Sequence, residues 1–110
     1  MDNRSVSILG ENWDIEFVSA GSDPKLEECE GYCDPSVRKI VVELPDDDVM
    51  NCCDTDEMLR RTLRHELVHA MAHESGLDGN SEWAMNEEMT AWVANQFTKL
   101  VRLFQLAGAM

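Results

Sequence analysis

Residues 65–69 read His-Glu-Leu-Val-His, and this stretch decides the fold and the chemistry that the chain can support. Residues four apart on an α-helix share a face, so the imidazoles of His65 and His69 can bind one metal ion. Glu66 would then lie beside the ion, where its carboxylate can act as general base on a water molecule. The motif has only five residues, so it indicates a metal site only if it lies within a helix.

The residues around the motif predict one helix that contains it. Asp54 can cap its first turn, with Glu57 three residues on, and Gly76 can end it. Apolar residues recur between them at helical spacing: Met58, Leu59, Leu63, Leu67, Ala70 and Met71. A surface helix that carries histidines by chance is the alternative, but two of the chain's three histidines fall at this spacing. We therefore expect one zinc ion (Zn2+) per chain.

A catalytic zinc site normally has three protein ligands, so the two histidines need a third. His73 continues the spacing, but three imidazoles at successive four-residue steps span roughly 12 Å of helix axis, too far to share one ion. A polar residue at the rim of the site, or an exposed residue in the last turn, is the better interpretation of His73.

A glutamate on a following helix is the expected third ligand. That helix is predicted to begin near Glu82, and it contains the adjacent Glu87 and Glu88. Only one of the two can point at the ion from a regular helix. Glu87 shares a strip with small residues that would let the helices approach closely: Ala84, Ala91 and Ala94.

The order of HExxH, a loop, and Asn-Glu at the head of another helix resembles the gluzincin metallopeptidases. The matching residues are His65, Glu66, His69, Asn86 and Glu87. The resemblance implies that Glu87 is the third zinc ligand, with Glu88 as the alternative, and that Glu66 is the general base in peptide-bond hydrolysis. The family has an aspartate four residues after the ligand, where this chain has Ala91, so one hydrogen bond that supports the site is missing.

Across the whole chain, the sequence is similar to short acidic HExxH proteins encoded by phages and prophages. It is more distantly similar to metallopeptidases that relieve phage repression by cleaving repressors. The segments that carry this similarity are residues 29–34, 39–42, 65–77 and 86–97. The similarity implies an intracellular protein substrate.

The expected fold is α+β, with residues 1–110 forming a single zincin-like metallopeptidase domain. A small antiparallel or mixed N-terminal sheet should precede the HExxH helix and a long C-terminal helix. Strands are predicted at 6–9, 13–18 and 38–44, the last ended by Pro45 and an aspartate run. Zincins lay the substrate against an edge strand, and we expect the strand containing residues 40–43 to provide that edge.

The charge and hydropathy of the sequence restrict the partners and the location that we expect. The formal net charge of −13 argues against nucleic acid and against anionic membrane surfaces, and favours a basic protein or peptide substrate. No segment approaches the roughly 20 apolar residues of a membrane span, and no signal peptide is recognised, so we expect a cytoplasmic protein. Most of the apolar stripe on the last helix should be core. Its distal part, residues 100–106, could extend past a small sheet and form a homodimer or partner surface.

Two groups of residues and one alternative function remain open. Tyr32 and His73 are candidates to stabilise an oxyanion, although a packed tyrosine is the commoner role for Tyr32. The cysteines show no CxxC spacing and are expected to be reduced thiols: Cys29, Cys33, Cys52 and Cys53. The alternative to a peptidase is a zinc-binding protein on a zincin scaffold, without proteolytic activity, that acts in binding or assembly. The presence of Glu66 favours the enzyme.

Overall fold

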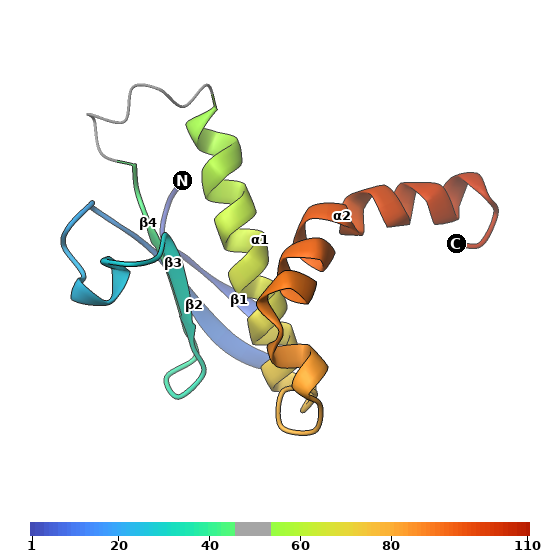
Figure 1. Cartoon of the computed structure of the whole chain (residues 1–110), viewed down its shortest axis with the longest axis horizontal. Coiled ribbons are helices and arrows are strands. Elements are labelled where there is room, and N and C mark those ends of the chain that lie inside the picture. The colour runs from blue at the N-terminus through green and yellow to red at the C-terminus, as the bar shows by residue number, and fades with distance from the viewer. Residues whose placement is uncertain (46–53) are drawn as a thin grey trace.

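The computed structural model describes residues 1–45 and 54–110 (Figure 1). A four-stranded mixed sheet is followed by two helices, so the predicted α+β class is confirmed. The elements are β1 (Arg4–Ile8), β2 (Glu11–Val18), the 3-10 turn η1 (Pro24–Leu26), β3 (Gly31–Asp34), β4 (Lys39–Glu43), α1 (Thr55–Glu74), the 3-10 turn η2 (Glu82–Met85) and α2 (Glu87–Leu106). The aspartate run 46–48, Cys52 and Cys53 lie outside the described residues.

The strand order of the sheet is β1-β2-β4-β3. β1 and β2 form an antiparallel hairpin, closed by Leu9 and Gly10 with φ of 50° and 89°, and such two-residue turns match the twist of the strands. β4 pairs in parallel with β2 and antiparallel with β3. The prediction that residues 40–43 provide the edge is therefore wrong, because β4 is internal and the edge strands are β1 and β3. The run Ile40-Val41-Val42 is buried throughout, as expected for a strand covered on both faces.

α1 packs across one face of the sheet, against β3 and β4 (Figure 1). The main hydrophobic cluster lies between them and consists of Ile8, Trp13, Ile15, Phe17, Ile40, Val42, Leu59 and Ala70. The buried indole of Trp13 donates to Glu74 Oε1 at 2.9 Å, and Arg38 Nε donates to the same oxygen at 2.5 Å. These bonds attach the C-terminal turn of α1 to the sheet.

The predicted limits of α1 are confirmed. The Asp54 side chain accepts a hydrogen bond from the Glu57 backbone N–H at 3.0 Å, which caps the first turn. At the other end Gly76 has φ of 79°. The Gly76 N–H donates to the His73 carbonyl, and the next N–H in the chain donates to the carbonyl of Ala72. These bonds form a Schellman motif, for which glycine is the favoured residue.

The start of α2 differs from the prediction. A helix was expected from about Glu82, but Glu82–Met85 forms the 3-10 turn η2, and α2 begins at Glu87. Asn86 has extended φ and ψ, and its side-chain oxygen accepts from the Met89 N–H at 2.8 Å. Asparagine favours this capping role over a helix interior, which explains why α2 starts here.

α2 packs against α1 through small side chains. Its buried residues are Thr90 and Ala94, whereas Trp92 and Phe97 are exposed, so the expectation that most of its apolar stripe is core is wrong. Arg64 on α1 donates from Nε to the Ala94 carbonyl at 3.2 Å. Beyond this crossing α2 runs away from the sheet (Figure 1). Within residues 1–45 and 54–110, no helix has the length and hydropathy of a membrane span.

Candidate metal centre

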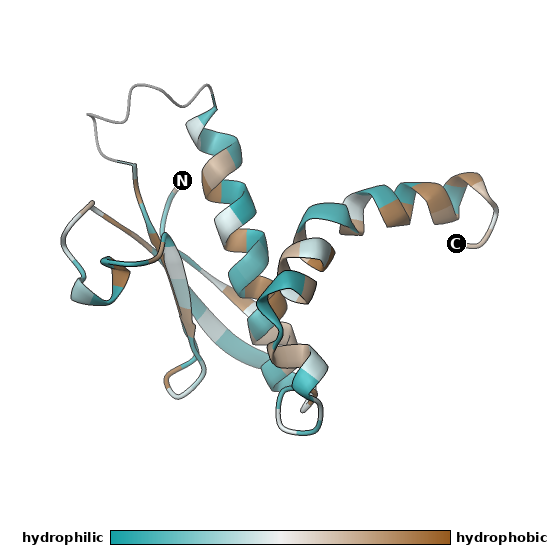
Figure 2. Ribbon diagram, in the orientation of Figure 1, coloured by the Kyte–Doolittle hydropathy of each residue, from teal (hydrophilic) through white to brown (hydrophobic). Residues whose placement is uncertain are grey.

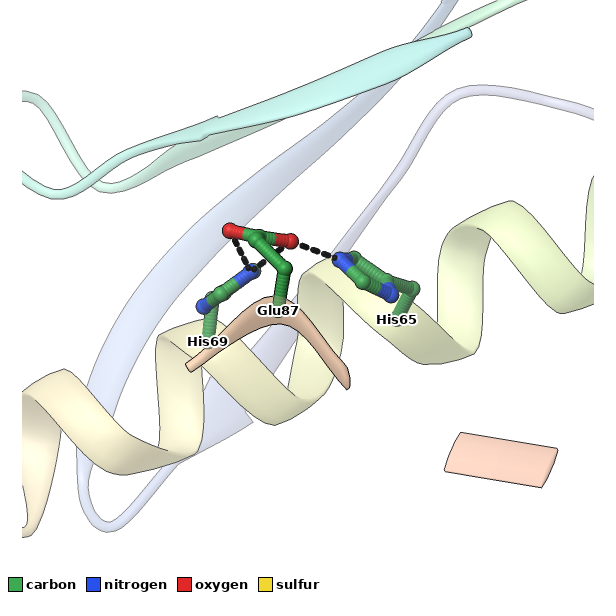
Figure 3. Close-up of side chains that lie close together, drawn as sticks. All are labelled: His65, His69 and Glu87. Atoms are coloured by element: carbon green, nitrogen blue, oxygen red, sulfur yellow. Dashed lines mark hydrogen bonds and ion pairs between the residues drawn. The ribbon is translucent and has the colours of Figure 1, made fainter. Parts of the chain in front are cut away.

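Three of the predicted ligands meet where α2 begins beside α1 (Figure 3). The imidazoles of His65 and His69 project from successive turns of α1, and their ring centroids are 4.9 Å apart. Glu87 opposes them: its Oε2 lies 2.8 Å from His65 Nε2, and its Oε1 lies 3.1 Å from His69 Nε2. One ligand atom from each residue can be chosen so that all three lie within 4.8 Å of one another. These residues thus form a group that could hold a metal ion.

The chemistry of this donor set fits zinc. Two imidazole nitrogens and one carboxylate oxygen are the ligands of a common class of catalytic zinc site, which leaves a fourth position for water. Both imidazoles are partly exposed, and the Glu87 side chain is 71% exposed, so water can reach the group. Partial burial opposes ionisation of Glu87. The hydrogen bonds and charges of His65 and His69 outweigh that burial and lower the Glu87 pKa, so its carboxylate is anionic, as a ligand must be.

Glu88 is exposed and does not belong to this group, although it neighbours Glu87 in sequence. The helical turn that directs Glu87 toward α1 directs the next side chain about 100° away. The small residues expected beside Glu87 also face the site, since Ala84, Ala91 and Ala94 line the same cleft as the three ligands. Close packing of the helices at these alanines brings Glu87 within reach of α1.

Glu66 is placed between the ligands and the edge strand β3. Glu66 is only 8% exposed, and this burial raises the pKa of its carboxyl group. The charge of Glu87 raises the pKa further, whereas the charges of His65 and His69 lower it. Glu66 packs near Gly31 of β3, where a Cβ atom would lie 3.6 Å from Glu66 Cγ. Gly31 was not singled out in the sequence, although a glycine within a strand often marks a close approach.

A cleft of about 720 Å³ contains the three ligands and Glu66 and lies between β3 and the two helices. The backbone carbonyl of Glu30 accepts a hydrogen bond from the Glu43 N–H at 2.9 Å. In an antiparallel pair, hydrogen-bonded and non-hydrogen-bonded residues alternate, so this bond shows which residues of β3 bond to β4. The backbone N–H and C=O groups of Gly31 and Cys33 consequently point away from β4, toward the open edge. Among residues 1–45 and 54–110 no strand pairs with this edge of β3, so these backbone groups lie along one wall of the cleft.

Tyr32 is among the residues that line the cleft, but its hydroxyl is bonded away from the three ligands. Alternation along β3 directs Gly31 toward α1 and Tyr32 toward the opposite face of the sheet. The Tyr32 hydroxyl donates to Asp23 Oδ2 at 2.6 Å, and this bond, with burial, raises the Tyr32 pKa to about 12. Lys25 Nζ lies 5.2 Å from the centroid of the ring. Tyr32 therefore attaches the η1 segment to β3, and its hydroxyl is not directed at the three ligands.

His73 is also engaged away from the ligands. Its Nδ1 lies 2.9 Å from Asp78 Oδ2, and its ring meets Trp13 edge-on at 6.3 Å between centroids. The prediction that His73 does not join the metal ligands agrees with its absence from the group formed by the described residues. The interaction with Asp78 has no local sequence signal beyond the polarity of the loop after α1.

Of the four cysteines, Cys29 and Cys33 lie in the described part of the chain, and both are free thiols that border the cleft. Cys33 packs against the core, and burial, with a contribution from the charge of Glu66, raises its pKa to about 12. The Cys33 side chain is therefore a neutral thiol at neutral pH, and it fills space beside Glu66.

No family model, curated protein or solved structure matches this chain. The geometry of the three ligands and the cleft is therefore the basis for assigning a function.

Proposed function

We propose that this protein is a zinc-dependent metallopeptidase of the gluzincin type that hydrolyses peptide bonds of a protein substrate inside the cell. The observation that carries the proposal is the convergence of His65, His69 and Glu87 in a cleft that also contains the buried Glu66. A site that only stabilises the fold would be closed by protein ligands, whereas this group has three ligands and is open to water.

The roles of the residues follow from their positions. A bound zinc ion would supply Lewis acidity, polarising the scissile carbonyl and lowering the pKa of water. Glu66 takes a proton from the attacking water and then delivers it to the leaving amine, and a carboxyl pKa raised by burial suits both steps. Gly31 and Cys33 pair through their outward backbone groups with an extended substrate and align its scissile bond with the cleft.

The charge of the cleft favours basic or neutral substrate segments. Glu30 and Asp78 line it in addition to Glu66 and Glu87, and Arg61 is the basic residue among its described lining residues. The formal net charge of −13 adds a long-range attraction for basic partners. Binding of a basic peptide should therefore weaken as ionic strength rises from low to physiological values, where the screening length falls to about 8 Å.

A zinc-binding protein without proteolytic activity is the second candidate. It is favoured by one observation: the Tyr32 hydroxyl is bonded to Asp23 and the His73 Nδ1 to Asp78, so neither of these groups is bonded to the three ligands. In this alternative the metal would contribute to folding or assembly, and Glu66 would be a buried carboxyl without a chemical role.

The test compares wild type with Glu66→Gln, which removes the base but none of the three ligands, and with Glu88→Gln as a matched charge-removing control. Each protein is loaded with zinc and analysed for metal content, then incubated with casein and with basic repressor-like proteins. The proposal expects one zinc ion per chain in all three proteins, with cleavage by wild type and Glu88→Gln. The rate of cleavage by Glu66→Gln should be at least about a hundredfold lower than that of wild type, which lies within the range of rate enhancements that a general base contributes. Equal cleavage by Glu66→Gln, or zinc binding without cleavage of any substrate, would refute the peptidase.

A further inference from the structure

The distal half of α2, residues 97–106, has its large apolar side chains in solvent, and we call this segment the arm. Phe97 is 58% exposed, Leu103 is 57% exposed and Leu106 is 74% exposed. Among the described elements α2 packs on α1 and η2, and the arm projects beyond that crossing (Figure 1). Figure 2 shows hydrophobic residues alternating with hydrophilic ones along its last turns. An exposed apolar surface on a helix marks an interaction site.

The apolar side chains of the arm continue a regular seam. Val93, Phe97, Leu100 and Phe104 follow one another at alternating intervals of four and three residues, which is the spacing of a helix that packs along a second helix. The opposite side of the helix is mainly polar, with Asn95, Thr98, Lys99, Arg102 and Gln105, although Leu106, four residues after Arg102, also falls on it. The seam itself contains no charged residue, so two copies of it can be paired without burying a charge.

The charges of the chain are divided between the arm and the rest. No acidic residue follows Glu88, so residues 89–110 carry only Lys99 and Arg102 and have a net charge of +2. The remaining residues are net −15, which makes up the −13 of the whole chain. Between two copies, contact between the acidic remainders, residues 1–88, is opposed by strong repulsion, whereas contact between the arms brings together only two weakly basic segments. The same acidic remainder disfavours attachment of the arm to an anionic membrane.

We infer that the arm is a dimerisation surface, which binds the arm of a second copy of this chain seam to seam. The exposed apolar area of the arm is on the order of 500 Å² per copy, so pairing two arms can remove at most about 1,000 Å² from water, because Leu106 lies off the seam. This area is at the lower limit for a specific interface, so the dimer should be weak and should depend on protein concentration. The dimer leaves the metal group of each copy outside the interface, because that group lies at the start of α2.

The test measures the mass of the full chain by sedimentation equilibrium from about 1 to 200 µM, so that the concentration dependence of a weak dimer can be followed. Wild type is compared with Phe104→Glu, which places a charge in the seam, and with Gln105→Glu, which adds the same charge to the polar side. Because a dimer carries each substitution twice, Phe104→Glu should raise the dissociation constant at least about a hundredfold, tenfold for each copy. Gln105→Glu should stay within a few fold of wild type.

Three results would overturn the inference. They are a wild-type chain that stays monomeric at all concentrations, an equal effect of the two substitutions, and binding of the wild-type monomer to phosphatidylcholine vesicles in place of self-association. The circular dichroism and zinc content of both variants are checked first. Phe104 lies in the exposed arm, so its replacement should leave both unchanged. The result is independent of peptidase activity.

Discussion

Replacing Gly31 by alanine tests how closely α1 must approach the edge strand that borders the cleft. A Cβ atom at this position would lie 2.7 Å from Thr62 Cγ2 and 3.0 Å from the Val41 carbonyl oxygen. Thr62 cannot rotate away freely, because its hydroxyl donates to the Met58 carbonyl at 3.1 Å and its β-branched side chain has few rotamers in a helix. The added methyl group must therefore push α1 and β3 apart beside Glu66.

The expected cost can be worked from these contacts. Overpacking by one methyl group costs about 1–3 kcal/mol, and the lower entropy of unfolded alanine offsets about 0.4–1 kcal/mol of that. The free energy of unfolding should therefore fall by roughly 1–2 kcal/mol, with Tm lower by about 5–10 °C for a domain of this size. Thr62→Ser removes Cγ2 but keeps the hydroxyl, so combining it with Gly31→Ala should recover about 0.5–1 kcal/mol as a coupling energy.

Urea denaturation followed by circular dichroism measures these changes for the two single variants and the double variant. Gly79→Ala is the matched control, because a Cβ atom there would meet nothing closer than 3.8 Å and no left-handed φ is involved. The steric reasoning would be refuted if Gly31→Ala were as stable as Gly79→Ala. Absence of recovery in the double variant would instead show that Thr62 is not the side chain that resists the methyl group.

Three further predictions concern the residues that position the site. The single tyrosine, Tyr32, should titrate near pH 12 in absorbance at the tyrosinate band, and Asp23→Asn should return it toward about 10. Because the pKa of Tyr32 is higher in the folded state, the stability that this bond contributes is complete below the unfolded pKa and is lost as pH rises toward 12. Titration of Tyr32 near pH 10 in the folded protein would contradict the bond to Asp23. Asn86→Ala should lower the free energy of unfolding by about 1 kcal/mol through loss of the α2 cap, while Asn86→Asp should not, and equal stability of the two in urea denaturation would argue against the cap. Glu74→Ala leaves the buried Trp13 N–H without its acceptor and should cost about 1–3 kcal/mol in the same assay, whereas Glu74→Gln keeps an acceptor and should cost less.

Features determined by neighbouring residues could be predicted from the sequence. Asp54 and Gly76 bound α1 because capping and the left-handed turn are local, and the four-residue spacing of His65 and His69 fixes their common face. Glu87 was expected as a ligand because Asn86-Glu87 matches the Asn-Glu pair of the family that the motif resembles, and the structure brings it to the histidines.

Features that depend on distant pairing could not be predicted in the same way. The prediction that residues 40–43 form the edge was wrong because strand order follows from contacts between segments far apart in sequence. The uninterrupted apolar run of β4 nevertheless indicated a strand buried on both faces. The expectation that most of the apolar stripe of α2 is core was wrong for a different reason. Helical periodicity reports that a helix has an apolar side, but it does not say whether this chain or another covers it. The exposed Trp92 and Phe97 belong to that uncovered side.

The most direct test of the central claim is the zinc affinity of Glu87→Gln measured against Glu88→Gln. Both variants lose one negative charge from the first turn of α2, and only Glu87 contacts the two imidazoles. Competition with a chromophoric chelator should give one zinc ion per chain for wild type. Affinity should be unchanged in Glu88→Gln and at least about a hundredfold weaker in Glu87→Gln, as expected when one of three ligands is lost. Equal affinity of the two variants, or no zinc binding by wild type, would contradict the metal centre.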